Sequence, residues 1–226
     1  MHAPGLLTDA DISRRAAYWY TDASVFGRVL QRGRPYICPF TPLYEHIPER
    51  SSLLDIGCGR GLFILGAAAQ GRVRRAIGID RSEAVLRDAR LAARRLVETA
   101  PELDGALLFS AVRSTAAWPT CTFEAVSLID VLHHVAPAER RQFLTEAAKR
   151  VEPGGVLIYK DMCDYPWWRA AANRLHDLLV ARHWADYLPL EQAQAWLNET
   201  GLVLRTRQSL DRYCYGHELL VLYRPH

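Results

Sequence analysis

The sequence lacks any long apolar segment. None of its stretches approaches the run of about eighteen apolar residues that a membrane-spanning helix needs. The first residues, MHAPGLLTDADISRR, also lack the basic segment followed by an apolar run that marks a secretory signal. We therefore expect no transmembrane segment and a cytoplasmic protein.

Cysteine is sparse, and its spacing argues against two kinds of site. The five cysteines lie far apart and form no C-x-x-C pair, so neither a disulfide framework nor a zinc site is indicated. The sequence likewise shows no cluster of carboxylates of the kind that binds magnesium. We expect a reducing compartment and no metal.

Neither sign of charge dominates the chain. Its 28 basic and 25 acidic residues leave a net charge of +3, and the basic residues are scattered among the acids. Proteins that bind nucleic acid usually concentrate basic residues on one face, so this pattern disfavours a nucleic-acid partner. With 226 residues, half of them apolar, the chain suffices for one domain spanning 1–226.

Short apolar runs alternate with helix-like segments through the middle of the chain. We expect helices over Leu62–Ala69, from Ser82 to about Thr99, and from Pro137 to Val151, where Pro153-Gly154-Gly155 ends the pattern. The expected strands are Ser51–Ile56, Ala76–Asp80, Ala106–Ala111, Ala125–Asp130 and Val156–Lys160. Apolar strands that alternate with helices indicate a doubly wound α/β fold with a mostly parallel sheet.

The C-terminal part of the chain breaks this alternation. Two β-like runs, Gly201–Arg207 and Glu218–Tyr223, follow one another with no helix between them. Consecutive strands without a crossover helix pair antiparallel, so we expect the fold to close with a β-hairpin.

The run Leu53-Leu54-Asp55-Ile56-Gly57-Cys58-Gly59-Arg60-Gly61 is the most informative segment. Glycines at the end of a first strand allow a sharp turn and let a ligand approach the backbone at the N-terminus of the next helix. Asp80 ends the second strand about twenty residues later, where a carboxylate can accept both hydroxyls of a ribose. The alternatives are a simple tight turn and a helix-capping acid, and Leu62 in place of a third dinucleotide-site glycine disfavours a nicotinamide cofactor.

These segments together resemble the class I S-adenosylmethionine-dependent methyltransferases. LLDIGCGRG, IGIDRSEAVLRDAR, FEAVSLIDVLHHV and VEPGGVLIYKD are similar to four motifs of that family and occur in the same order. The resemblance implies a Rossmann-like, seven-stranded, mostly parallel sheet with a C-terminal antiparallel hairpin. It also implies an N-terminal helical cap over 1–50, a cofactor-binding core over 51–160, and lid helices with the closing hairpin over 161–226.

The resemblance further implies which residues hold the cofactor, S-adenosylmethionine, and its product S-adenosylhomocysteine. The glycines would pass the amino-acid end, Asp55 would lie close to the ammonium group, and Asp80 would hold the ribose. Ser114 occupies the position where the family usually carries an acid that contacts the adenine amine. The full predicted set is Asp55, Gly57, Cys58, Gly59, Gly61, Asp80, Arg81, Ser114 and Asp130.

Candidate proton acceptors follow the fourth and fifth strands. Asp130, His133 and His134 follow the fourth, and Asp161 ends the fifth. The segment resembles small-molecule methyltransferases, which implies His133 or His134 as general base and Asp161 as its orienting acid. A buried structural histidine and a loop acid are the alternatives.

Specificity should come from segments outside the sheet. Tyr18 and Tyr20 near the N-terminus, and Trp167 and Trp168 after the fifth strand, are candidates for a substrate lid, with core packing as the alternative. The expected reaction is methyl transfer to oxygen or carbon of an aromatic, polyketide, quinone or sugar-like acceptor. The second hypothesis is a non-catalytic or RNA-associated protein that binds the same cofactor.

One further contact is expected on weaker grounds. Arg169, Arg174 and Arg182 flank an apolar stripe rich in tryptophan. A basic amphipathic helix of this kind can touch an anionic membrane surface. A solvated helix face explains the same charges, so peripheral membrane contact is the less favoured interpretation.

Overall fold

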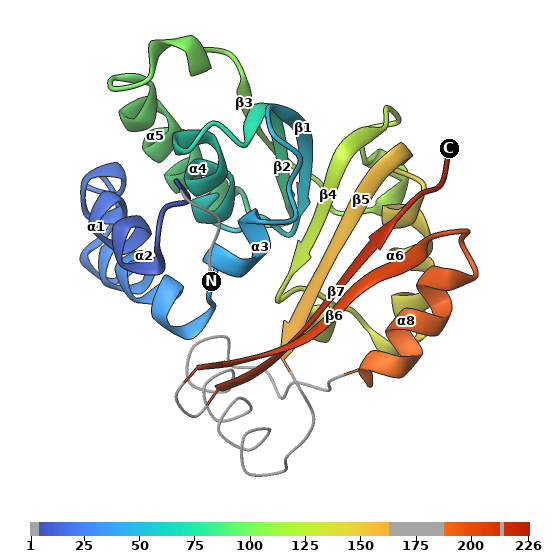
Figure 1. Ribbon diagram of the computed structural model, residues 1–226. Coiled ribbons are helices and arrows are strands. Elements are labelled where there is room, and N and C mark those ends of the chain that lie inside the picture. Colours follow the sequence, from blue (N-terminus) through green and yellow to red (C-terminus); the bar gives the residue numbers. More distant parts are fainter. Residues whose placement is uncertain (1–4, 163–187, 213–214) are drawn as a thin grey trace.

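A computed structural model describes residues 5–162, 188–212 and 215–226. Its centre is a seven-stranded sheet with the strand order β3-β2-β1-β4-β5-β7-β6 (Figure 1). The first five strands pair in parallel, and β7 pairs antiparallel with both β5 and β6. The strands are β1 (Ser51–Ile56), β2 (Val73–Asp80), β3 (Leu107–Ala111), β4 (Phe123–Ile129), β5 (Val151–Met162), β6 (Val203–Arg212) and β7 (Tyr215–Tyr223). The predicted α/β fold with a mostly parallel sheet and an antiparallel closing hairpin is confirmed.

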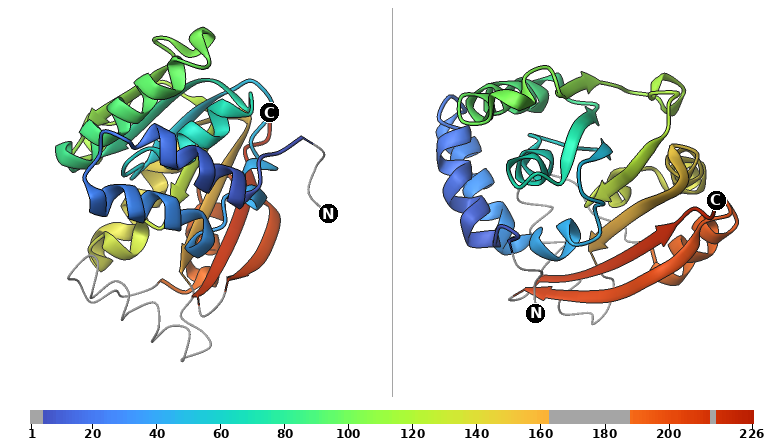
Figure 2. Two further views of the ribbon diagram at one scale, coloured as in Figure 1. Left: turned by 90° about the vertical axis from the view of Figure 1, so that its left-hand side faces the viewer. Right: turned by 45° about the horizontal axis from the view of Figure 1, so that its top comes forward.

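Helices cover both faces of the sheet (Figures 1 and 2). The α-helices of the described residues are α1 (Asp9–Trp19), α2 (Val25–Ile37), α3 (Thr41–Tyr44), α4 (Leu62–Ala69), α5 (Glu83–Val97), α6 (Arg140–Ala148) and α8 (Leu190–Asn198). One apolar core joins α1, α3, α4 and α5 to one face, and a second core joins α6 and α8 to the other. Among the described residues, no helix is long and apolar enough to cross a membrane.

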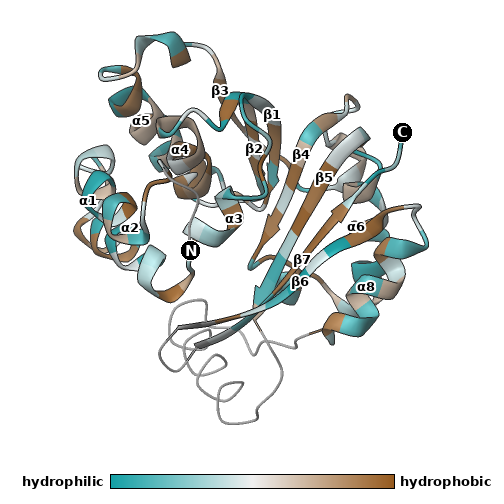
Figure 3. Cartoon of the chain, viewed as in Figure 1, coloured by the Kyte–Doolittle hydropathy of each residue, from teal (hydrophilic) through white to brown (hydrophobic). Residues whose placement is uncertain are grey.

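The central strands are buried on both sides, as continuous apolar runs predict. Every residue of β1 is buried, and so are the seven residues Leu62–Ala68 of α4, the helix that follows it. Hydropathy along β5 changes at its carboxyl end, where an apolar middle gives way to hydrophilic residues (Figure 3). This polar end lies at the edge of the sheet where the site is built.

The structure corrects several predicted boundaries. Helix α6 ends at Ala148, and β5 begins at Val151 rather than after Pro153-Gly154-Gly155. The β5 strand can pass through that segment because Gly154 N donates to Arg224 O at 2.8 Å, which anchors it to the C-terminal tail. Strand β2 begins three residues earlier than expected, and the closing strands are longer than the apolar runs alone.

Candidate active site

The glycine turn joins β1 to α4. Gly57, Gly59 and Gly61 all have positive φ angles, of 75°, 53° and 79°, in the left-handed region that favours glycine. A Cβ at Gly57 would lie 2.4 Å from Val131 Cγ2, so close packing also requires glycine there. At Gly59 a Cβ would meet no atom within 4 Å. The turn therefore presents its backbone to open space at Gly59.

Asp80 braces the glycine turn from the end of β2. Its Oδ2 accepts a hydrogen bond from Gly59 N at 3.0 Å, and its Oδ1 accepts one from Ser82 N at 2.9 Å. Ser82 occupies the N-cap position of α5, but its side chain makes no capping bond. The carboxylate is thus held by two backbone N–H groups at the carboxyl end of the sheet.

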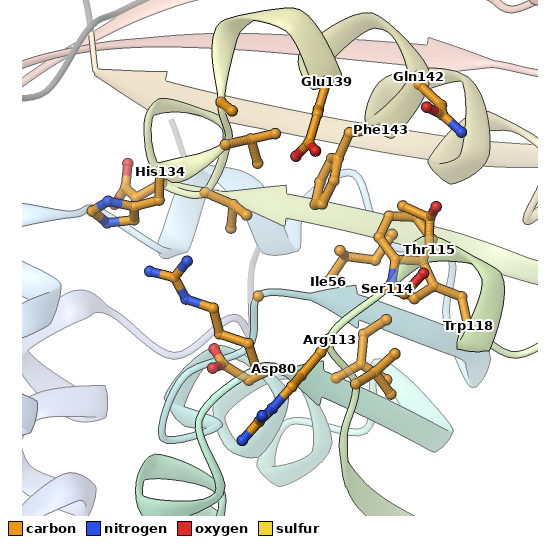
Figure 4. A pocket seen from close by; sticks show the side chains of 18 residues that line it. Ile56, Asp80, Arg113, Ser114, Thr115, Trp118, His134, Glu139, Gln142 and Phe143 are labelled. Atoms are coloured by element: carbon orange, nitrogen blue, oxygen red, sulfur yellow. The ribbon is translucent and has the colours of Figure 1, made fainter.

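A cleft of about 620 Å³ opens along the carboxyl ends of β1 to β4 (Figure 4). Its walls come from the glycine turn and the β2 end on one side, and from the segment after β4 and helix α6 on the other. At one end, Trp118 packs edge-to-face on Phe143 with ring centroids 4.9 Å apart. The predicted residues that line the cleft are Gly57, Asp80, Arg81, Ser114, Asp130 and His134.

The cleft is also lined by residues that the sequence did not predict. They come from the loop after β3, from the 3-10 turn η4 (Pro137–Glu139) and from helix α6, which have no recognisable motif. The additional lining residues include Arg113, Thr115, Trp118, Glu139, Gln142 and Phe143. In the sequence, Trp118 and Phe143 are isolated aromatic residues, which predict packing rather than a site.

Asp130 lies at the centre of a buried ion cluster. Its φ of 55° is unusual for a residue other than glycine. Lys160 Nζ, on a completely buried side chain, lies 2.6 Å from Asp130 Oδ1, and Arg34 Nη2 lies 3.1 Å from Oδ2. Burial would raise the pKa of Asp130, but the charges of Lys160 and Arg34 outweigh it and lower the pKa. A carboxylate held by two cations is a poor proton acceptor, so the structure argues against Asp130 as a base.

Two further groups pack into this cluster. Lys160 Nζ donates to Cys38 Sγ at 3.1 Å. His217 Nε2 lies 2.7 Å from Ile37 O, which fixes its hydrogen on that nitrogen. Burial, and next the charge of Lys160, lower the pKa of His217 to about 4. The sequence carried one signal for this cluster, since a lysine is unexpected in an otherwise apolar strand.

His133 and Asp161 form a second buried pair, joining the segment after β4 to the end of β5. His133 Nδ1 lies 2.6 Å from Asp161 Oδ1, and both residues are buried. An ionised carboxylate only accepts hydrogen bonds, so His133 Nδ1 carries the hydrogen of this contact. Asp161 Oδ1 also accepts from Met162 N at 2.8 Å, which fixes the carboxylate.

The second predicted histidine has a different environment. His134 is exposed and lines the cleft, and its ring centroid lies 4.0 Å from that of His133. The structure therefore places one imidazole in the cleft wall and pairs the other with a carboxylate.

Asp55 is buried at the carboxyl end of β1. Ser127 Oγ donates to its Oδ1 at 2.7 Å. In the part of the chain that the structure describes, no salt bridge to Asp55 is found. Burial raises the pKa of Asp55 to about 7, although the hydrogen bond from Ser127 opposes this shift.

Three predicted residues point elsewhere. Tyr18 OH donates to Glu98 Oε2 on the outside of the helices. Tyr20 is buried, and its hydroxyl donates to Arg60 O at 2.6 Å. Neither tyrosine lines the cleft formed by the described residues, and a lid role for them stays a prediction. The Cys58 side chain is directed toward Gly78, where a Cβ would lie 2.8 Å from Cys58 Sγ.

Some predictions fall on other parts of the chain. Trp167 and Trp168, as well as the arginines at 169, 174 and 182, lie outside the described residues. Among residues 5–162, 188–212 and 215–226, no group of three or more His, Cys, Asp or Glu side chains is arranged to hold a metal ion.

The chain is similar to known methyltransferases. Residues 29–207 match the family described as "Methyltransferase domain". The ubiquinone biosynthesis O-methyltransferase of Alkalilimnicola ehrlichii is 31% identical over 169 residues, 72% of this chain and 64% of that relative. The enzyme of the same name from Idiomarina loihiensis is 26% identical over 182 residues, 74% of this chain and 69% of the relative. The aligned segments thus span about two thirds of the length of these relatives.

A solved structure supports the fold. Magnesium protoporphyrin IX methyltransferase from Synechocystis PCC 6803, solved with bound SAH, superposes with a TM-score of 0.66 at 18% identity, covering 93% of each chain. Because the family match extends over well more than half of the residues, the chain belongs to the methyltransferase domain family, with the fold of the class I S-adenosylmethionine-dependent enzymes.

Proposed function

We propose that this methyltransferase transfers a methyl group from S-adenosylmethionine to a hydroxyl oxygen of a small, ring-bearing acceptor, with His133 as the general base. The observation that carries the proposal is the buried His133–Asp161 pair at 2.6 Å. The names of the relatives, which are O-methyltransferases of ubiquinone biosynthesis, support oxygen as the methylated atom and a quinone-like ring as the acceptor class.

The residues of the cleft and of the adjoining end of β1 and glycine turn fit the cofactor. The left-handed glycine turn leaves open space at Gly59, where the amino-acid end of the cofactor would approach the backbone. Asp80, held by Gly59 and Ser82, would accept hydrogen bonds from the ribose hydroxyls. Asp55 is a buried acid without a cation of its own among the described residues, which suits a ligand ammonium group. When bound, S-adenosylmethionine supplies an electrophilic methyl group on a sulfonium.

The chain then has to accept a proton from the acceptor. In this proposal Asp161 holds the hydrogen on Nδ1 of His133, and Nε2 takes the hydroxyl proton. The carboxylate of Asp161 also stabilises the imidazolium that results, as the aspartate does in the Asp–His pair of a catalytic triad. Asp130 cannot share this role because Lys160 and Arg34 hold its charge.

The test is to replace each histidine by asparagine and to vary the acidity of the acceptor. With a weakly acidic catechol, His133→Asn should lower kcat by roughly 10²- to 10⁴-fold, the usual contribution of a general base. With a nitrocatechol, which is already ionised, the loss should shrink to less than about tenfold, because no proton has to be removed. Affinity for S-adenosylhomocysteine should stay the same.

His134→Asn is the matched control. It changes the neighbouring, exposed imidazole and should lower kcat by less than about fivefold with either acceptor. A larger loss in His134→Asn than in His133→Asn, or a His133→Asn loss that is independent of acceptor acidity, would contradict the assignment of His133.

A further inference from the structure

The end of the cleft beyond Asp80 has unusual hydrogen-bonding chemistry. If Asp80 holds a ribose, the attached base lies next to it, between the loop after β3 and helix α6. The loop side is lined by Val112, Arg113, Ser114, Thr115 and Trp118. None of these five side chains is a carboxylate. The loop wall of the base site therefore has no side chain that only accepts hydrogen bonds.

Three of the polar side chains at this end can both donate and accept hydrogen bonds. The hydroxyls of Ser114 and Thr115 each donate and accept, and so does the amide of Gln142 on the opposite wall. Ser114 is the N-cap of a short 3-10 turn, where its Oγ accepts from Ala116 N at 3.3 Å. Its hydroxyl hydrogen remains available to a ligand acceptor, and its second lone pair to a ligand donor.

The three acids that line the cleft do not lie in the loop wall beside Ser114. Two of them have other hydrogen-bond or ion-pair partners, and the third lies on the opposite wall. Asp80 is occupied by the N–H groups of Gly59 and Ser82, and Asp130 by Lys160 and Arg34. Glu139, on the η4 turn before α6, is the remaining acid of the described lining and belongs to the wall opposite Ser114 (Figure 4). A carboxylate at the base would favour a 6-amino purine over a 6-oxo purine, because it accepts from an amine and repels a carbonyl oxygen.

We propose that Ser114 makes this cleft tolerant of the purine 6-substituent, so that it binds a cofactor with a hypoxanthine base nearly as well as one with adenine. The inference rests on the proposed function, since it takes the cleft to be the cofactor site. Ser114 is a specificity-determining residue in this view: its hydroxyl accepts from a 6-amino group and donates to a 6-oxo group. An aspartate at the same position would do only the former.

Isothermal titration of the wild-type chain with S-adenosylhomocysteine and with S-inosylhomocysteine tests this directly. The two dissociation constants should agree within about fivefold, since neutral hydrogen bonds of similar strength are exchanged. A larger ratio in favour of S-adenosylhomocysteine overturns the inference while leaving the proposed function intact. Absence of binding by either ligand overturns the proposed function and the inference with it.

Two variants at Ser114 and one at Glu139 make the test specific. Ser114→Asp should raise the ratio of the S-inosylhomocysteine dissociation constant to that of S-adenosylhomocysteine by roughly 10- to 100-fold. The charged acceptor gains a hydrogen bond from the 6-amino group and has none with the 6-oxo group. Ser114→Asn, with an amide that donates and accepts, should keep the wild-type ratio. Both residues are good N-caps, so the turn should persist in each. If wild type discriminates and Glu139→Gln abolishes the discrimination, Glu139 reads the base and the inference is wrong.

Discussion

Two buried acids at the ends of neighbouring strands have opposite electrostatic environments. Asp55 ends β1 against a serine hydroxyl, and its pKa is raised to about 7, chiefly by burial. Asp130 follows β4 between Lys160 and Arg34, whose charges outweigh the effect of burial and lower its pKa. The chain neutralises Asp130 with its own cations, whereas in the proposed function Asp55 pairs with the ammonium group of the cofactor. On that proposal, the comparison separates an acid that stabilises the fold from one that binds the cofactor.

Removing a cation that neutralises Asp130 should have the largest effect on stability. Lys160→Met leaves Asp130 buried with Arg34 as its remaining cation, and loss of one partner of a buried pair costs roughly 3–5 kcal/mol. Urea unfolding near neutral pH should show this loss. The double variant Lys160→Met with Asp130→Asn should recover most of it, because no uncompensated carboxylate remains.

The pH dependence of the free energy of unfolding gives a second test of the same variant. A folded pKa below the usual Asp value stabilises the fold at neutral pH, and this contribution is lost as pH falls through the folded pKa. In Lys160→Met the pKa of Asp130 rises, so protonation in acid relieves the variant. The stability gap between wild type and Lys160→Met should therefore narrow as pH falls toward about 4. A constant gap would contradict the role given to Asp130.

Removing the charge of Asp55 should act on binding instead. Asp55→Asn keeps an acceptor for Ser127 but loses the carboxylate, and affinity for S-adenosylhomocysteine should fall by roughly 10- to 100-fold at about pH 8. Stability should not fall. The raised pKa means that ionised Asp55 costs folding free energy as pH rises from the usual Asp value toward 7, and the variant removes that cost.

Calorimetry and urea unfolding of one Asp55→Asn preparation measure both effects. Unchanged affinity, or a loss of stability like that of Lys160→Met, would remove the distinction between the two acids.

The smallest effect is expected at the backbone of the glycine turn. Gly59→Ala places a Cβ in open space but at a φ of 53°, so strain of about 1 kcal/mol should be its main cost to folding. Gly57→Ala adds the contact with Val131 at 2.4 Å and should cost several times more. Thermal unfolding compares the two. Equal losses would show that packing does not set the turn.

The sequence predicted the parts of the fold whose ends are set by local residues such as glycine. The bounds of β1 and α4 were predicted correctly because glycines end both segments. The start of β5 was missed because Pro153-Gly154-Gly155 looks like a terminator, whereas pairing with the C-terminal tail carries the strand through it. Such a pairing between distant segments leaves no local pattern.

The candidate site was also predictable only in part. Acids and glycines at strand ends can be located from the sequence, since parallel strands end at one edge of the sheet. Which acid is neutralised cannot, because Arg34 comes from a helix 96 residues before Asp130. The tyrosines show the same limit: aromatic residues of an N-terminal helix can face a cleft or the core, and Tyr20 faces the core.

The most direct test is the number of protons exchanged when S-adenosylhomocysteine binds. Calorimetry in buffers of different ionisation enthalpy measures it. If the ammonium group of the ligand pairs with Asp55, binding ionises the carboxyl, and close to one proton should be released at about pH 6, falling to none at about pH 8.5. Asp55→Asn should release none at either pH. Binding by the wild type without proton release at about pH 6 would contradict the account.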